Sequence, residues 1–350
     1  MRKFVTVTVT ATATLAAASL LLSGCISSSG TGDETGVQGA STEALVVYNA
    51  QHEKLTEEWV KEFTAQTGID VVLRNGGDSE LSNQLVAEGD ASRADVFLTE
   101  NSLAMSLVEK AGLLSPVDPA TLALVPTQYR PASGMWTGIA ARSTVFVYNP
   151  DLLAESELPT SILDLQDPRW KSNWGGAPAG ADFQAIVSAI LETQGTEATT
   201  AWLTGMKNNA TIYRNNIATM KAVNAGEVAG GIIYHYYWFR DSASGGENSG
   251  NTKLHYFGEQ DPGAFVSISG GGVLKSSDNS DKAQQFLAFL AGVSGQTILG
   301  EGYSFEYPVG GDVPAKDPLP SLDSLNAPII DPSTLNAPEI LDLMTQVGLL

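Results

Sequence analysis

The stretch ALVVYNAQHEKLTEEWVKEFTAQTGIDVVL, residues 44–73, decides the fold. It begins with a short apolar run that is typical of a buried strand. Leu55, Trp59 and Phe63 then recur every four residues with charged side chains between them, which predicts an amphipathic helix. Gly68 ends that helix before a second apolar run. The stretch therefore predicts a strand, a helix and a second strand in succession.

The same alternation continues after residue 73. A helix is expected over 78–89, a strand over 94–98 and a helix over 101–111. Strands that alternate with helices predict an α/β fold with a parallel sheet, in which ligands bind beyond the carboxyl ends of the strands. Because His52 follows the first strand and Glu100 follows the third, we expect both side chains at that edge.

A second block of elements begins near residue 142. Strands are expected over 143–148, 230–234, 265–268 and 272–274, and helices over 183–193, 200–206, 218–224, 282–290 and 338–347. The strands after residue 265 lead back toward the first block. About 300 residues remain after the N-terminal segment, which is enough for two lobes with separate cores.

The N-terminus has the pattern of an export signal. Two cationic residues precede an uncharged apolar stretch over 5–22, and the following LSGC at 22–25 resembles a bacterial lipobox. We expect residues 1–24 to be a lipoprotein signal peptide and Cys25 to be lipidated. An uncleaved membrane anchor is the alternative, but the threonine and alanine content of the stretch disfavours it.

Cys25 is the single cysteine of the chain, so neither an internal disulfide nor a cysteine metal site is expected. A diacylglycerol group on Cys25 would give stable membrane anchoring. The segment 25–43 is rich in serine, glycine and threonine, and we expect a flexible tether there. The protein would then be exported and lipid-anchored at the outer face of the cell membrane or on its periplasmic side.

The charge of the chain excludes some partners. The formal net charge is -20, and loss of Arg2 and Lys3 with a signal peptide makes it -22. Such a chain is repelled by nucleic acids and by anionic membrane surfaces. We therefore expect no nucleic-acid partner, and membrane contact through the lipid anchor only.

Motifs of common catalytic sites are absent from the sequence. It contains no Gly-x-Ser-x-Gly elbow, no Walker-type phosphate loop and no His-Glu-x-x-His zinc motif. The three histidines are His52, His235 and His255. We therefore expect a binding protein and not an enzyme.

An unusual aromatic run, YHYYWF, follows the strand expected over 230–234. It could be an aromatic core strand, a stacking wall for a sugar, or a metal site. A phenolate is a hard anionic oxygen ligand, and ferric iron is the hard cation that suits it. Neighbouring residues of a regular strand point to opposite faces. Tyr236 and Tyr237 can therefore share one ion only if the backbone changes there, and a switch from strand to helix would achieve this.

Several segments together resemble one family. VYNAQH at 47–52, ADVFLTE at 94–100 and YYW at 236–238 resemble motifs of the ferric-ion-binding proteins of bacterial ABC importers, the bacterial transferrins. Segments 142–149 and 260–264 match as well, and the resemblance covers nearly the whole chain from residue 44. It implies a two-lobed type II periplasmic-binding-protein fold with a hinge and an interlobe cleft. The expected lobes are 44–142 plus 267–318 and 143–266 plus 319–350.

The resemblance also implies the ligand and the partner. The protein would be a monomeric extracytoplasmic solute-binding lipoprotein that captures Fe3+ and delivers it to the permease of an ABC importer. His52 and Glu100 would bind the metal from one lobe, and Tyr236 and Tyr237 from the other. His235 neighbours the pair but matches no family ligand.

Many family members hold a synergistic anion beside the iron, such as phosphate or carbonate. The resemblance places four residues of this chain near it: Asn216, Asn101, Gly180 and Ala181. Arg142 could neutralise the charge of an anion there. Asp182 adds a carboxylate that would repel phosphate, so we expect a different anion, such as carbonate, or none. Tyr234 stands where the family has an asparagine; it is a third phenolate or a packing residue, and packing is favoured.

An alternative with the same fold is a binding protein for an organic or oxyanion solute, such as a sugar, a polyamine or a phosphonate. The aromatic side chains would then stack on the solute and Arg142 would pair with it. A screen of metals against such solutes by thermal shift separates the two hypotheses, because a ligand stabilises the protein that binds it.

Overall fold

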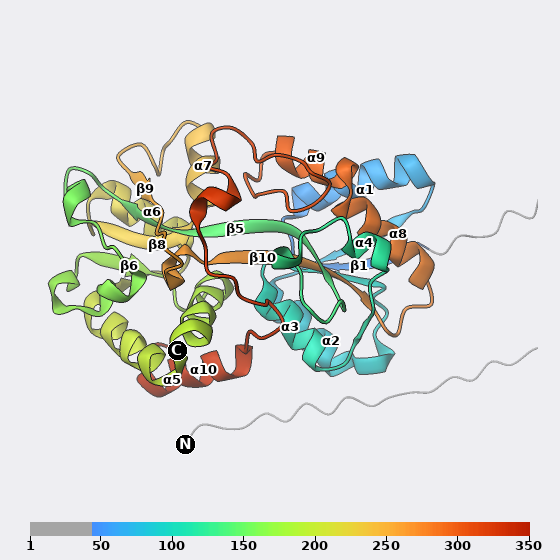
Figure 1. Ribbon diagram of the computed structural model, residues 1–350, viewed down its shortest axis with the longest axis horizontal. Helices are drawn as coiled ribbons and strands as arrows, with labels where there is room; N and C mark the ends of the chain where they lie inside the picture. The colour runs from blue at the N-terminus through green and yellow to red at the C-terminus, as the bar shows by residue number, and fades with distance from the viewer. Residues whose placement is uncertain (1–43) are drawn as a thin grey trace, which may run out of the picture. The chain divides into compact units, whose positions relative to one another are not determined.

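The computed structural model describes residues 44–350 (Figure 1). The predictions for residues 1–43, which include the signal peptide, Cys25 and the tether, lie outside the described residues. The strands are β1 (Leu45–Asn49), β2 (Val71–Asn75), β3 (Val96–Leu98), β4 (Leu114–Ser115), β5 (Thr137–Tyr148), β6 (Trp174–Gly176), β7 (Ala210–Ile212), β8 (Gly230–Tyr234), β9 (Lys253–His255) and β10 (Val266–Leu274). The α-helices are α1 (Glu53–Thr67), α2 (Asp78–Glu88), α3 (Ser102–Lys110), α4 (Pro119–Leu122), α5 (Ala181–Asn209), α6 (Asn216–Ala225), α7 (His235–Ala243), α8 (Ser280–Ala291), α9 (Val293–Glu301) and α10 (Ala337–Val347).

The strands of the described chain follow the order β2-β1-β3-β10-β5-β8-β6-β7, with β4 on β10 and β9 on β5. At one end, β1 pairs in parallel with both β2 and β3, as the strand–helix alternation predicts. Helix α1 buries Leu55, Trp59 and Phe63 and ends at Gly68, whose φ of 71° lies in the left-handed region. The sequence pattern therefore predicted this half of the sheet correctly.

Strands β5 and β10 join the two halves of the sheet, and Figure 1 shows them side by side across the molecule. One end of β5 pairs with β10 and its other end pairs with β8, while β10 continues to β3. The sequence predicted two separate strands around the three glycines at 270–272, but β10 runs through them. A Cβ at Gly270 would lie only 2.9 Å from the Trp136 ring, so the glycines permit close packing on the sheet.

In the other half of the sheet, β6 pairs in parallel with β7 and β8. Helix α5 covers both helices that the sequence predicted here, and the break between them is a kink at Gly195, where φ is 80°. The C-terminal helix α10 packs against α5 and also against α3. Among residues 44–350, none of the helices combines the length and the apolar character needed to span a bilayer.

Candidate functional site

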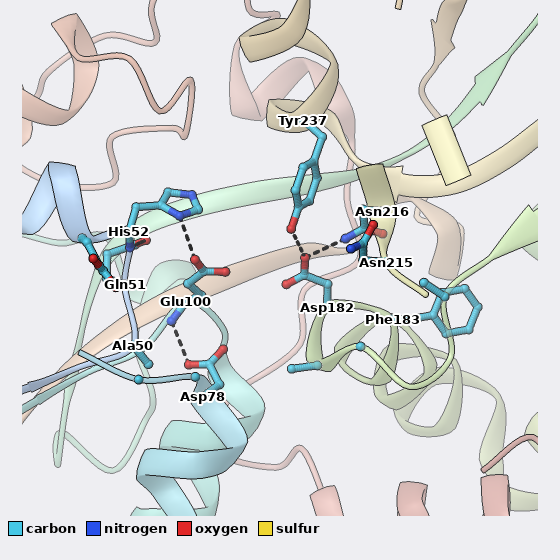
Figure 2. A pocket seen from close by; sticks show the side chains of 16 residues that line it. Ala50, Gln51, His52, Asp78, Glu100, Asp182, Phe183, Asn215, Asn216 and Tyr237 are labelled. Carbon is cyan, nitrogen blue, oxygen red and sulfur yellow. Dashed lines mark hydrogen bonds and ion pairs between the residues drawn. The ribbon is translucent and has the colours of Figure 1, made fainter. Parts of the chain in front are cut away.

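A cavity of about 400 Å³ lies between the two halves of the sheet. Residues from the β1–β3 half and residues from the β6–β8 half line it together (Figure 2). Its polar lining includes His52, Asp78, Glu100, Asp182, Asn216 and Tyr237. The cavity therefore brings the predicted strand-end residues opposite the residues of the second block.

Helix N-termini surround this cavity. Four helices, α1, α2, α5 and α6, have N-cap residues that line it: His52, Gly77, Gly180 and Asn215. The N-terminus of a helix carries partial positive charge, which stabilises nearby anions. Asp78 and Asp182 lie in the first turns of α2 and α5, so their carboxylates are placed where these dipoles favour them.

His52 and Glu100 meet at one wall of the cavity. The Nδ1 atom of His52 lies 2.8 Å from Oε1 of Glu100, and Arg142 donates a 3.1 Å hydrogen bond to Oε2 of Glu100. Burial alone would raise the pKa of Glu100, but His52 and Arg142 outweigh it and lower the pKa to about 2. Burial would likewise lower the pKa of His52, but Glu100 and Glu306 outweigh it and raise that pKa. This wall therefore holds an ionised carboxylate.

Asp182 organises the opposite wall. Its Oδ2 atom accepts hydrogen bonds from Asn216 Nδ2 at 2.8 Å and from the Tyr237 hydroxyl at 3.0 Å (Figure 2). The Arg142 guanidinium lies 3.8 Å from its other oxygen. Burial and the nearby Glu100 charge raise the pKa of Asp182 to about 6, although Arg142 opposes them. Asp182 thus accepts the hydrogen bonds of donors that could otherwise bind an exogenous anion.

The tyrosine pair lies where β8 ends and α7 begins. The predicted switch from strand to helix is confirmed, since β8 ends at Tyr234 and α7 begins at His235. The rings of Tyr236 and Tyr237 stack with their centroids 4.1 Å apart. The Tyr236 ring also meets the His52 ring edge-on, at a centroid distance of 5.2 Å.

The two phenols differ in exposure. Tyr237 lines the cavity, whereas Tyr236 is fully buried behind it and its hydroxyl has no hydrogen-bond partner. Burial raises the pKa of Tyr236 well above its usual range, and the charges of Tyr237 and Asp182 add to the effect. Burial and Asp182 do the same to the pKa of Tyr237. Both side chains are therefore neutral phenols until a cation compensates their charge.

The residues predicted to lie near an anion divide into two groups. Gly180, Ala181 and Asn216 line the cavity. Arg142 is fully buried beneath it, and the Asn101 side chain donates a hydrogen bond to Asp78 and does not line the cavity.

Tyr234 is also fully buried, and its hydroxyl has no hydrogen-bond partner. It does not line the cavity. Burial raises its pKa.

His235 is tied to the backbone on both ring nitrogens. Its Nδ1 accepts a 3.1 Å hydrogen bond from the Ser143 amide, and its Nε2 lies 2.8 Å from the Phe305 carbonyl oxygen. Burial lowers its pKa to about 3. Neither nitrogen is left for a ligand.

Sequence reasoning missed two carboxylates of the site. Asp78 accepts a hydrogen bond from the Glu100 amide at 3.0 Å, and burial and Glu100 raise its pKa well above the usual range. Glu306 is fully buried and pairs with Arg142. The position of Asp78 at the start of a predicted helix, after a strand, could have indicated its role. No sequence motif marks Glu306.

Imidazole and carboxylates alone do not make a metal centre here. Within residues 44–350, no group of three or more His, Cys, Asp or Glu side chains is arranged to hold a metal ion. The phenols of Tyr236 and Tyr237 are further oxygen donors beside His52 and Asp182.

Comparisons with known proteins agree on one family. Residues 91–331 match the model of a family described as bacterial extracellular solute-binding protein. The chain is 58% identical over 316 residues to the Fe(3+)-binding periplasmic protein of Serratia marcescens, a match that covers 90% of this chain and 94% of that protein. Both findings show a transport family of solute-binding proteins, not enzymes, that work outside the cytoplasm.

Solved structures agree with this result. Iron-bound HitA from Pseudomonas aeruginosa superposes with a TM-score of 0.82 at 41% identity, covering 87% of this chain and 99% of that one. A Trichodesmium IdiA (FutA) structure in complex with iron and citrate gives a TM-score of 0.75 at 28% identity, covering 87% of this chain and 99% of that one. The predicted α/β, two-lobed type II periplasmic-binding-protein fold is thereby confirmed. The chain belongs to the bacterial extracellular solute-binding proteins and, among them, to the ferric-ion-binding periplasmic proteins.

Proposed function

We propose that this protein captures ferric iron in the cavity between the two halves of its sheet. The proposed ligands are His52, Glu100, Tyr236 and Tyr237. One observation carries the proposal: the buried Tyr236 ring contacts both Tyr237 and His52, which belong to opposite walls, and its hydroxyl has no hydrogen-bond partner. A buried polar atom without a partner is costly, and a metal ion would satisfy it.

Charge favours a trivalent cation over other solutes. When iron binds, the proposed ligands Glu100, Tyr236 and Tyr237 contribute three negative charges, which balance Fe3+. Burial keeps both phenols protonated in the iron-free protein, so a weakly charged ligand would not ionise them. Hard phenolate and carboxylate oxygens also match ferric iron better than they match zinc or copper.

The iron-free contacts must exchange when iron arrives. Glu100 has to release His52, and Tyr237 has to release Asp182, before these atoms can bind the metal. Both carboxylates keep another hydrogen bond, since Arg142 still pairs with Glu100 and Asn216 still donates to Asp182. The exchange therefore leaves no carboxylate of the site without a hydrogen bond.

We further propose that iron binding here does not depend on phosphate. The Asp182 carboxylate already accepts the hydrogen bonds of Asn216 and Tyr237, and phosphate near it would meet like charge. A carbonate, another small anion or no anion at all is expected beside the iron.

Transport would follow from closure of two lobes, residues 44–142 plus 267–318 and residues 143–266 plus 319–350. Support comes from β5 and β10, which join the two halves of the sheet, and from the cavity that both halves line. We propose that a single copy of the protein, held at the membrane by a lipid on Cys25, passes its iron to the permease of an ABC importer.

Colour tests the iron proposal directly. Purified protein loaded with ferric iron should show a visible phenolate-to-iron charge-transfer band, and the Tyr236→Phe/Tyr237→Phe protein should not. Thermal-shift measurements with ferric iron, sugars, polyamines and phosphonates should show stabilisation by iron. A colourless iron complex, or stabilisation by an organic solute only, would contradict the proposal.

A further inference from the structure

Glu306 is a buried carboxylate that the proposed ligand set does not use. It is fully buried, and it lies next to Tyr307, whose backbone forms a β-bridge with Ala141 of β5. Its Oε1 accepts hydrogen bonds from Arg142 and, at 3.4 Å, from Gln51. Its Oε2 has no hydrogen-bond partner. A buried carboxylate oxygen without a donor is uncommon and points to a donor that arrives in another state.

The atom that faces this oxygen is also without a partner. His52 Nε2 is buried, makes no hydrogen bond and lies 3.8 Å from Glu306 Oε2. The other nitrogen of the ring, Nδ1, lies 2.8 Å from Glu100 Oε1. The imidazole thus stands between two carboxylates, close to one and slightly too far from the other for a hydrogen bond.

Iron binding would change this balance. If His52 and Glu100 both bind iron, the nitrogen that faces Glu100 is the one nearest the metal, and the hydrogen bond between the two residues is lost. The remaining N–H must then find an acceptor. Metal-bound histidines almost always donate that second N–H to a carboxylate or a carbonyl, which fixes the ring orientation. Glu306 Oε2 is an acceptor in place, and a shift of less than 1 Å would bring it into range.

We propose that Glu306 is the positioning residue of the iron site, and that its carboxylate accepts the Nε2–H of iron-bound His52 while it stays paired with Arg142. This inference rests on the proposed ferric site. Oε2 of Glu306 would hold the ligand histidine, and Oε1 would keep its pairing with the Arg142 guanidinium, which also pairs with Glu100.

Other polar side chains near His52 already use their hydrogen-bonding atoms on other partners. The Ser269 hydroxyl accepts hydrogen bonds from both Gln51 and Arg142 and donates to the Glu100 carbonyl. His235 uses both ring nitrogens on the backbone. Glu306 therefore offers the acceptor that His52 Nε2 lacks.

A double-mutant cycle tests the relation. Ferric affinity is measured by competition with nitrilotriacetate for four proteins: the wild type, Glu306→Gln, His52→Ala and the double variant. Glu306→Gln should weaken ferric affinity about 10- to 100-fold when His52 is present, the usual effect of losing such a partner. In the His52→Ala protein the same change should weaken the affinity much less, because the histidine that Glu306 positions is absent. Any effect through Arg142 is present in both backgrounds and cancels in the comparison.

Two further readouts separate positioning from folding. The melting temperature of the iron-free proteins reports a purely structural loss, and the position of the charge-transfer band reports a change at the iron. The control Glu109→Gln removes a carboxylate that accepts a hydrogen bond from Trp136 and does not line the cavity, and it should leave both affinity and band unchanged.

The outcomes are distinguishable. An equal loss of affinity in both backgrounds would overturn the role of Glu306 and leave the ferric site intact. A wild-type protein that neither binds iron nor becomes coloured would overturn the ferric site and this inference with it. If Glu306→Gln does not fold, Glu306→Asp takes its place, since it keeps the charge for Arg142 and withdraws the carboxylate from His52.

Discussion

The Tyr237 hydroxyl donates a 3.0 Å hydrogen bond to Asp182, so a proposed iron ligand is held by a carboxylate of its own wall of the cavity. The same carboxylate oxygen accepts from Asn216. If Tyr237 binds iron, the metal competes with Asp182 for its oxygen, and Asp182 then lies beside the metal. The chemistry at Asp182 should decide how this site treats anions.

Removal of the Asp182 charge should make iron binding responsive to phosphate. In Asp182→Asn the Asn216 amide and the positive helix N-termini would face a neutral side chain, and phosphate could bind there. We expect phosphate to slow iron release to a chelator about 10-fold in this variant, roughly the effect of one favourable charge interaction. Release from the wild-type protein should be independent of phosphate, and an equal response of both proteins would contradict the idea.

Loss of one tyrosine should weaken the colour and the affinity together. Tyr237→Phe removes one phenolate, so the charge-transfer absorbance per iron should fall to about half, and the ferric affinity should fall at least about 100-fold, since a metal–ligand bond is lost. Absorption spectroscopy and chelator competition measure both. The control is Tyr148→Phe, because the Tyr148 hydroxyl contacts Glu155 and does not line the cavity. A similar loss in the control would show that the effect is not specific to the site.

Acidification should release the iron. The phenol pKa values of Tyr236 and Tyr237 are raised in the iron-free protein, so iron must displace two protons to bind both oxygens. The apparent affinity should then fall at least about 100-fold for each pH unit below neutrality, since His52, whose pKa is also raised, must lose a proton to bind the metal. The slope of the logarithm of affinity against pH measures this number, and Tyr237→Phe should lower it by one. A flat profile would contradict binding through phenolates.

The iron-free protein should lose stability in acid through His235. The folded-state pKa of this residue is about 3, below its ordinary value of 6.5, because burial disfavours the charged ring. Between these two values the unfolded chain binds one proton more than the folded chain, so the free energy of unfolding falls as pH drops. One proton gives a slope of about 1.4 kcal/mol per pH unit. Above pH 6.5 His235 is neutral in both states, so it no longer makes the free energy of unfolding depend on pH.

Denaturant unfolding of metal-free protein between pH 6.5 and pH 4 measures this slope. His235→Gln should show a shallower dependence by nearly one proton, even if it is less stable at every pH. The difference between the two proteins removes the contributions of other titrating groups. Parallel curves for the two proteins would show that His235 does not titrate on unfolding.

Local patterns were enough to predict much of this fold. The spacing of Leu55, Trp59 and Phe63 predicted α1, because a helix repeats its buried face every 3.6 residues. Because ligand-site residues follow the carboxyl ends of parallel strands, His52 and Glu100 were predicted at one edge of the sheet. Nδ1 of His52 lies 2.8 Å from Oε1 of Glu100 there. Patterns failed where tertiary contacts override them, as in β10, whose glycines stay extended because they pair with β5 and β3. The Trp136 ring leaves no room for a Cβ at Gly270.

By itself, the sequence determined the alternation of strands and helices over residues 44–111, the placement of His52 and Glu100 at one edge of the sheet and the switch from strand to helix before the tyrosine pair. Each of these depends on neighbours within a few turns of chain. Only the tertiary structure decided which side chains of the site contact one another. It brought Glu306 to His52, placed Asp182 between Asn216 and Tyr237, and turned Asn101 toward Asp78. Such contacts join residues that are tens to hundreds of positions apart in the sequence. They depend on how the two walls of the cavity pack against each other, and the periodicity of the sequence does not encode that packing.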